Sequence, residues 1–327
     1  MKLLCSTRRV VSAVLAGMVG CLICNPANAL DKPAGFPARN IEIINPFKAG
    51  GSTDVYLRTL IPALEKALGT RTLVVNETGG EGVRAFDDVV SRPADGHTVY
   101  AIGPEELINT VFGRVKFDQL TPVARVEEDV SVFWVLNDSP FKTWADVVSY
   151  AKTNPDKLIV AGSYGIDQIV TAMLFKEAGN LKVKYVPFSV GNEAVAALLG
   201  GHVQLLHEEP GGMTAQLEAK LVRPLIAISD QRIERLPEAA IAKAEGYQVD
   251  LARWRGIAVK KGTPPEIVKF LAQAFEEAAK STAYKTSAHR MMTDLRSGYL
   301  GPDEFAAFLD RDLATYKKEM PALGLVR

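Results

Sequence analysis

A short glycine-rich loop holds the first residues of this sequence that could bind a small molecule. Residues 46–54 read PFKAGGSTD. The glycines let the backbone approach a ligand closely, and small hydroxyl side chains can donate hydrogen bonds to it. Asp54 either contacts a ligand or caps the following helix. The loop predicts polar binding, with candidate residues Phe47, Gly51, Ser52 and Thr53.

A second glycine loop, residues 76–82 (NETGGEG), contains a near match to the dinucleotide-binding fingerprint. The spacing G-x-G-x-x-A begins at Gly80, and Glu105 follows at roughly the distance of a ribose-binding acid. The match is weak because residues 76–79 separate the glycines from the preceding strand, whereas a true fingerprint turns almost directly off it. We therefore expect no cofactor and retain Gly80 and Glu105 as ligand-binding candidates.

The strongest sign of catalysis is residues 161–165 (AGSYG), which follow a strand and precede a helix as a nucleophile elbow does. A catalytic Ser163 would need an acid and a later histidine, and the later histidines lie in no recognisable context. A binding loop with no catalytic residue is favoured, and a secreted serine hydrolase using Ser163 is the alternative. The loop adds the ligand-binding candidates Gly162, Ser163 and Asp167.

Residues 207–209 (HEE) end a strand-like run and invite a metal interpretation. They lack the i, i+4 histidine pair of strong zinc signatures, and three adjacent side chains cannot all face one ion. We expect no metal and a ligand contact from Glu208. Phe188, after another strand-like run, is a further candidate, and Trp254 either walls the cleft or fills the core.

Short strand-like runs alternate with helical patterns along most of the chain. Residues 41–45 predict a strand, 46–52 a loop and 53–68 a helix, and further strands are expected at 72–75 and 98–102. Such alternation predicts parallel sheets covered by helices on both faces. The fold class is therefore α/β.

A second series of the same kind begins near Val130, with strands expected at 158–161, 184–186, 203–206 and 225–228. Two cores fit this pattern better than one, with residues 130–135 and 249–259 carrying the chain between them. We expect one lobe from residues 30–130 plus 253–327 and the other from residues 131–252. In open α/β sheets ligands bind beyond the carboxyl ends of the strands, where the loops above lie.

The N-terminus has the pattern of a secretory signal, residues 1–29. Basic residues precede an uncharged apolar run at 10–24, and Ala27-Asn28-Ala29 forms an A-x-A cleavage site. The run is shorter than the roughly 20 residues of a membrane-spanning helix. We expect a soluble periplasmic protein, with lipid anchoring at Cys21 as the alternative.

Composition narrows the chemistry of the mature chain. All three cysteines lie inside the predicted signal, which excludes disulfides and cysteine nucleophiles from the remainder. The whole chain has 38 basic and 38 acidic residues, and removing Lys2, Arg8 and Arg9 leaves 35 against 38, a net charge of −3. Neither nucleic acid nor an anionic membrane surface is expected as a partner.

Taken together, the loops resemble those of the periplasmic binding proteins of tripartite tricarboxylate transporters, also called the Bordetella uptake gene family. The resemblance covers nearly the whole mature chain. It is carried by seven strings in order: 43–54 (IINPFKAGGSTD), 74–82 (VVNETGGEG), 93–98 (PADGHT), 154–163 (NPDKLIVAGS), 186–188 (VPF), 198–203 (LLGGHV) and 261–264 (KGTP).

The resemblance implies a type II periplasmic binding protein fold, with two α/β lobes joined by two crossover strands and a ligand cleft between them. It implies a receptor that captures a small carboxylate or zwitterionic metabolite and delivers it to membrane permease subunits. A ligand-presenting sensor of the same fold is the alternative, and we expect a monomer. Family-type contacts, through main-chain amides, hydroxyls and bridging waters, carry over to Phe47, Gly51, Ser52, Gly162 and Ser163.

Several acidic residues depart from the family pattern. Small or hydroxyl residues are usual where this chain has Glu105 and Glu106, and an Asp-Asn pair is usual near residues 207–209. Two unit charges about 4 Å apart interact at roughly 4 kcal/mol near a protein surface, so several acids facing the cleft would repel a dicarboxylate. Either the acids bind the positive end of an amino-bearing, zwitterionic or cation-complexed ligand, or they line the outer rim beside an ordinary carboxylate.

Overall fold

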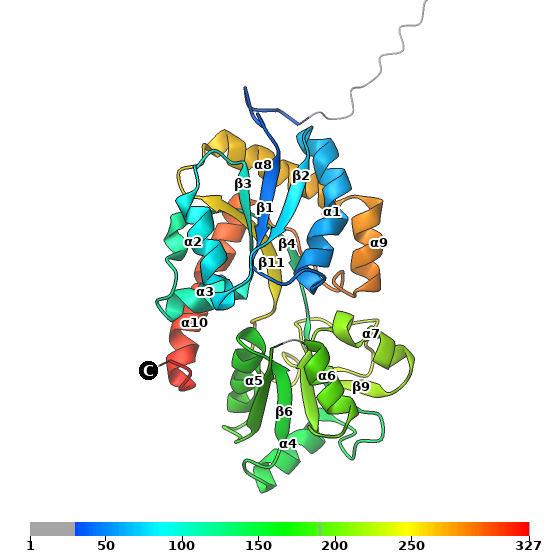
Figure 1. The fold of residues 1–327 in the computed structure, drawn as a ribbon. Coiled ribbons are helices and arrows are strands. Elements are labelled where there is room, and N and C mark those ends of the chain that lie inside the picture. The colour runs from blue at the N-terminus through cyan, green and yellow to red at the C-terminus, as the bar shows by residue number, and fades with distance from the viewer. Residues whose placement is uncertain (1–29, 190, 327) are drawn as a thin grey trace, which may run out of the picture.

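The protein folds into two α/β lobes, each built on its own sheet (Figure 1). The computed structural model describes residues 30–189 and 191–326, so the predicted signal and Cys21 lie outside the described residues. Lobe 1 is built on a five-stranded sheet with the order β2-β1-β3-β11-β4. Lobe 2 is built on a six-stranded sheet with the order β10-β9-β5-β8-β6-β7.

Lobe 1 has strands β1 (Ile41–Asn45), β2 (Thr72–Asn76), β3 (Thr98–Ile102), β4 (Leu120–Glu128) and β11 (Trp254–Lys260). Its helices are α1 (Ser52–Leu68), α2 (Val83–Ser91), α3 (Pro104–Val111), α8 (Pro265–Ala279), α9 (Thr282–Arg290) and α10 (Pro302–Ala322), with short 3-10 turns at Gly80–Gly82 and Phe117–Gln119.

Lobe 2 has strands β5 (Ser131–Leu136), β6 (Ile159–Ser163), β7 (Lys184–Phe188), β8 (Leu205–Glu208), β9 (Val222–Ile228) and β10 (Ala240–Ile241). Its helices are α4 (Trp144–Thr153), α5 (Ile166–Glu177), α6 (Gly191–Leu199) and α7 (Pro210–Glu218). None of the helices in residues 30–189 and 191–326 is long and apolar enough to cross a membrane.

The expectation of parallel sheets is wrong for two strands. β11 is antiparallel to both β3 and β4, and β5 is antiparallel to β8 and β9. Both strands receive the chain from the other lobe, so they start at the lobe boundary and run away from it. The strands β1, β3, β6 and β8 run towards that boundary, as the parallel pairs and the antiparallel partners require.

Helix α1 shows how the apolar pattern fixes the lobe. Its residues Leu57, Leu60, Leu64 and Leu68 are fully buried at helical spacing and share a core cluster with Ile43. Burial of each such side chain contributes about 1.5–3 kcal/mol. Because one face of α1 is held against the sheet, the loop before it has a fixed place at the lobe boundary.

Candidate functional site

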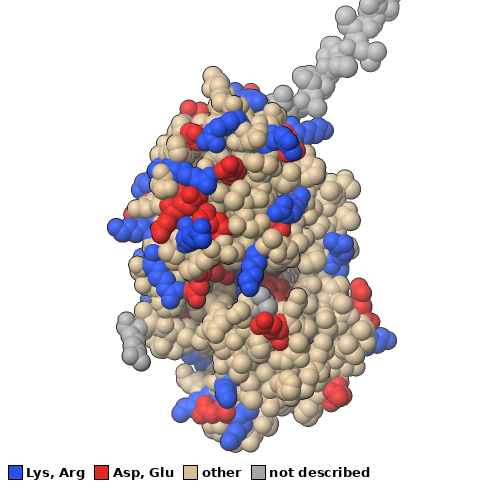
Figure 2. Space-filling view, in the orientation of Figure 1, with Lys and Arg blue, Asp and Glu red and all other residues tan. Residues whose placement is uncertain are grey.

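The polar loops of both lobes meet at the lobe boundary, where strands end and helices begin. In lobe 1, α1 and α3 follow β1 and β3, and in lobe 2, α5 and α7 follow β6 and β8. Figure 2 shows the surface hollowed between the lobes, with acidic side chains beside the hollow. This is the position at which α/β sheets bind ligands.

Three of these helices start with glycine. Gly51, Gly103 and Gly165 are the N-cap residues of α1, α3 and α5, and none supplies a side-chain cap in the described part of the chain. The first amide groups of a helix lack partners within the helix and carry partial positive charge, so they attract anions. For α3 the first residue is Pro104, which has no amide hydrogen, and the Glu106 side chain accepts from the Gly103 amide at 2.8 Å, so α1 and α5 offer more free amides at their starts.

Asp54 holds the first glycine loop in shape. Its carboxylate accepts hydrogen bonds from the Gly50 amide at 2.9 Å, from Arg58 Nε at 2.9 Å and from Asn76 Nδ2 at 3.0 Å. The bond from Arg58 is the main cause that lowers the pKa of Asp54. Of the two roles left open from the sequence, Asp54 therefore has a structural one, and it fixes the backbone at Gly51 and Ser52.

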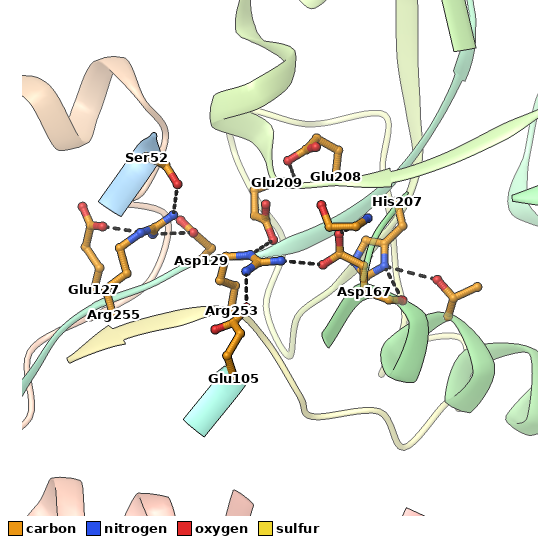
Figure 3. Close-up of polar contacts among 12 residues, drawn as sticks. Ser52, Glu105, Glu127, Asp129, Asp167, His207, Glu208, Glu209, Arg253 and Arg255 are labelled. Atoms are coloured by element: carbon orange, nitrogen blue, oxygen red, sulfur yellow. Dashed lines mark hydrogen bonds and ion pairs between the residues drawn. The ribbon is translucent and has the colours of Figure 1, made fainter. Parts of the chain in front are cut away.

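The centre of the boundary is occupied by Arg253, which leads into β11 (Figure 3). Its Nη1 lies 3.0 Å from Glu105 Oε1, its Nη2 lies 3.0 Å from Asp167 Oδ1, and its Nε lies 2.8 Å from Glu209 Oε1. Glu105 belongs to lobe 1, and Asp167 and Glu209 belong to lobe 2. One guanidinium thus joins carboxylates from both lobes.

The carboxyl groups around Arg253 differ in their pKa values. Burial raises the pKa of Glu209, but Arg253 and the hydrogen bond with Glu208 act in the opposite direction, and the value is brought to about 2. Burial raises the pKa of Asp167, with Arg253 opposing the rise. Glu208, packed between Gly191 and Gly212, has its pKa raised well above the usual range by burial and by the charge of Glu209. Glu209 is therefore ionised at neutral pH, and Glu208 is the member of the pair that holds a proton more readily.

Arg255 forms a second ionic group beside the first. Its Nη1 lies 3.0 Å from Glu127 Oε2 and 2.7 Å from Asp129 Oδ2, and its Nη2 donates to Ser52 Oγ at 3.3 Å. Burial raises the pKa of Asp129 to about 6 against the influence of Arg255. This group connects the start of α1 to the segment that crosses from lobe 1 to lobe 2.

Glu106 turns away from this ionic network although Glu105 takes part in it. It is buried, it accepts from the Tyr100 hydroxyl at 2.8 Å and from the Gly103 amide, and burial together with Glu105 raises its pKa to about 8. A protonated Glu106 therefore supports α3, and of these two acids Glu105 is the one that presents charge at the lobe boundary.

The structure brings five of the predicted ligand-binding residues into one connected network. Ser52 bonds to Arg255, Glu105 and Asp167 pair with Arg253, the Ser163 amide donates to Asp167 Oδ2 at 2.8 Å, and Glu208 accepts from the Glu209 amide at 3.1 Å. The other predicted residues make no bond to Arg253 or Arg255 among the described residues: Phe47, Gly51, Thr53, Gly80, Gly162 and Phe188. Gly162 leaves no room for a side chain, because a Cβ there would meet the Tyr185 hydroxyl.

Ser163 lacks the partner that a nucleophile needs. His207, the histidine that contacts this network, bonds through Nδ1 to the Asp167 carbonyl at 3.0 Å and to Thr171 Oγ1 at 3.2 Å. Within the described residues, no histidine bonds to the Ser163 hydroxyl and no group of His, Cys, Asp and Glu has the arrangement of a metal site.

Sequence reasoning missed Arg253 and Arg255 as members of the site, and within residues 207–209 it chose Glu208 as the ligand contact although Glu209 is the one that pairs with Arg253. The available signal was the pair of arginines in RWRG, next to an otherwise apolar strand. Trp254 between them fills the core, because it is 1% exposed, packs against Phe305 and donates to Asp312 Oδ2 at 3.1 Å.

Two lobes, two crossings of the chain and helix starts that converge on a central boundary define a type II periplasmic binding protein. The model of the tripartite tricarboxylate transporter family receptor matches residues 56–318. The chain belongs to this family, whose members are receptors and not enzymes, so the serine hydrolase alternative is excluded.

Relatives and solved structures agree with this assignment. The chain is 28% identical over 297 residues to a protein in the gbd 5′ region of Cupriavidus necator, covering 89% of this chain and 90% of the relative. It is 29% identical over 259 residues to BugT of Bordetella pertussis, covering 76% and 78%. The crystal structure of a TctC solute binding protein from Polaromonas superposes with a TM-score of 0.76 at 28% identity, covering 88% of this chain and 99% of that one.

The same fold occurs in two structures solved with ligands. Rpa4515 of Rhodopseudomonas palustris with adipate gives a TM-score of 0.75 at 23% identity, covering 88% of this chain and 98% of that one. MatC of the same species with bound malate gives 0.72 at 22% identity, covering 86% and 99%.

Proposed function

We propose that this receptor works in the periplasm after residues 1–29 direct its export, and that it binds a carboxylate-bearing small molecule at the lobe boundary. As a monomer, it then presents the bound molecule to the membrane permease subunits of a tripartite transporter. Two neighbours of the same fold carry adipate and malate, which supports a carboxylate as one part of the ligand. Hinge movement at the two crossings would admit and release the ligand.

The observation that carries this proposal is the open start of α1 at the boundary. Gly51 is the N-cap with φ −70° and ψ 168°, and the loop before it is held by Asp54. A ligand carboxylate placed there would accept hydrogen bonds from the first amides of α1, as anions do at helix starts. Ser52 and, from lobe 2, the backbone at Gly162 and the hydroxyl of Ser163 are proposed to complete the ligand contacts.

A matched pair of substitutions tests this site. Gly51→Asp would place a carboxylate over the amides of α1, where Asp is a favourable N-cap residue, with its Cβ 3.1 Å from the Lys48 carbonyl oxygen. Gly301 is the N-cap of α10 with nearly the same backbone, φ −70° and ψ 178°, and a Cβ there would have nothing within 4 Å. Gly301→Asp is therefore the control for adding one acidic cap.

Isothermal titration with a panel of mono- and dicarboxylates, including malate and adipate, supplies the measurement. Gly51→Asp is expected to remove the carboxylate binding that the unaltered protein shows, and Gly301→Asp is expected to keep it. Equal affinity of the two variants for the same carboxylate would contradict a binding site at α1.

A further inference from the structure

The ionic group around Arg253 has more negative than positive charge. Glu105 and Glu209 together bring two negative charges, and Arg253 brings one positive charge. The sum is −1 with Asp167 protonated and −2 with Asp167 ionised. The arginine is therefore already paired with more carboxylates than it can neutralise.

The neighbouring group adds to this excess. Arg255 is paired with Glu127 and Asp129, and above a pH of about 6, the pKa of Asp129, their charges sum to −1. The two groups are continuous, because the Asp129 amide donates to the Arg253 carbonyl at 2.8 Å. Neither arginine is left over to attract a second anionic group of a ligand.

The Arg253 group keeps an accessible edge. The side chains of Glu105, Glu209 and Arg253 are 20%, 14% and 17% exposed. Arg253 takes only Oε1 of Glu105, and Oε2 of Glu105 accepts no hydrogen bond from residues 30–189 and 191–326. An incoming donor therefore finds an acceptor here without breaking an ion pair.

His207 provides an independent observation that is consistent with a polar ligand. Its ring is 0% exposed, and Nε2 has no hydrogen-bond partner among the described residues. The ring stacks on Phe133 with centroids 4.5 Å apart, and Figure 3 shows it beside Asp167. Buried polar atoms nearly always have a partner, so this nitrogen offers one further hydrogen bond in the neighbourhood of Asp167.

We infer that the ligand is a zwitterion whose ammonium group lies among Glu105, Asp167 and Glu209, while its carboxylate lies at the start of α1. This inference rests on the proposed function, because it uses the same cleft and the same carboxylate position. A dicarboxylate would place its second negative charge against the carboxylate excess, whereas an ammonium group supplies both opposite charge and donors.

Comparing ligands of equal chain length separates the effect of ligand charge on affinity from the effect of ligand size. ω-Amino acids of three to six carbons are compared by isothermal titration with the dicarboxylates of the same length, in buffer with EDTA. Hydrogen bonds to charged groups correspond to about tenfold or more in affinity, so the amino acid is expected to bind at least about tenfold more tightly at the length that fits.

A variant that removes one negative charge shows whether that acid discriminates between the amino acid and the dicarboxylate. Glu105→Gln keeps the shape and an oxygen for Arg253, and it is expected to bring the ratio of the two affinities down about tenfold or more. Glu42→Gln is the matched control, because Glu42 also pairs with an arginine, Arg92 at 2.5 Å. Glu42 lies near the start of β1, at the end of that strand far from the lobe boundary.

The outcomes distinguish this inference from the proposed function. Tighter binding of the dicarboxylate at every length that binds overturns the zwitterion and leaves the carboxylate receptor standing. A ratio unchanged by Glu105→Gln overturns the assignment to this acid group. No binding by either series overturns the inference together with the proposed carboxylate site.

Discussion

The guanidinium of Arg253 lies 3.0 Å from the carboxylate of Asp167, although 86 positions separate the two residues in the chain. Arg253 enters the sheet of lobe 1, and Asp167 starts a helix of lobe 2. Their contact means that the ionic network is part of the lobe boundary itself. Changes in this network should therefore affect both stability and ligand binding.

Removal of Arg253 should strongly destabilise the protein. Arg253→Ala leaves Asp167 and Glu209 without their cation, and breaking a buried ion pair by removing one partner costs about 3–5 kcal/mol. The free energy of unfolding from urea titration gives the measurement. Arg84→Ala is the control, because its pair with Glu77 leaves Arg84 72% exposed, and it should change stability by less than about 0.5 kcal/mol. A similar decrease in the free energy of unfolding in both variants would show that Arg253 does not stabilise the lobe boundary as described.

Asp312 should make stability fall as the pH rises. Burial raises its pKa from 3.8 to about 7, so the folded protein holds a proton that the unfolded chain releases. The stabilising contribution is complete below a pH of about 4 and is lost as the pH rises through about 7, with a slope of at most about 1.4 kcal/mol per pH unit. Urea titrations from pH 4 to 8 measure the slope.

The matched variant for this pH dependence is Asp312→Asn. Its amide oxygen can still accept from Trp254, but the group no longer titrates, so the stability profile should become flatter. Asp310→Asn, exposed on the same helix, controls for the loss of one charge. A profile that keeps its slope in Asp312→Asn would show that this acid is not the cause.

The sequence predicts the elements of this fold better than their direction. The strand at residues 41–45 and the one at 98–102 have the expected bounds, because apolar runs between turn residues specify strands locally. The direction of β11 depends on which lobe the chain comes from, and no local pattern contains that information.

The residues of the candidate site were also predictable only in part. Glycine loops are visible in the sequence because close backbone approach requires glycine, and they led to Gly51 and Gly162. Arg253 could not be assigned, because its three partners lie 44, 86 and 148 positions away and only the folded chain brings them together. An excess of acids at the cleft was predicted, but their pairing with arginine was not.

A methyl group at Gly162 should disturb the lobe 2 binding loop. In Gly162→Ala the new Cβ would meet the Tyr185 hydroxyl and lie 3.2 Å from Asp167 Cβ. Overpacking of this kind costs about 1–3 kcal/mol, and we expect that loss in urea titration. Gly301→Ala, which adds the same methyl group in open space, should leave the free energy of unfolding nearly unchanged. Full stability of Gly162→Ala would contradict the tight packing beneath the loop.

Tyr164 should contribute to binding without contributing to stability. Tyr164 is 56% exposed although it is a large aromatic residue, and it lies in the loop between β6 and α5. The next residue, Gly165, would place a Cβ 3.6 Å from Ile108 of lobe 1, so this loop faces the lobe boundary. An aromatic ring at that position can cover a bound ligand and its ammonium group, an interaction of about 0.5–2 kcal/mol.

For Tyr164→Ala we therefore expect a severalfold loss of affinity, in isothermal titration, for the ω-amino acid that the unaltered protein binds most tightly, with an unchanged urea midpoint. Tyr164→Phe should keep the affinity, because the ring and not the hydroxyl makes the contact. Leu221→Ala removes an apolar side chain of similar exposure, 50%, just before β9, and should change neither quantity. If Tyr164→Ala binds as tightly as the unaltered protein, the loop does not close over the ligand, and the grip from lobe 2 must come from its amides and Asp167 alone.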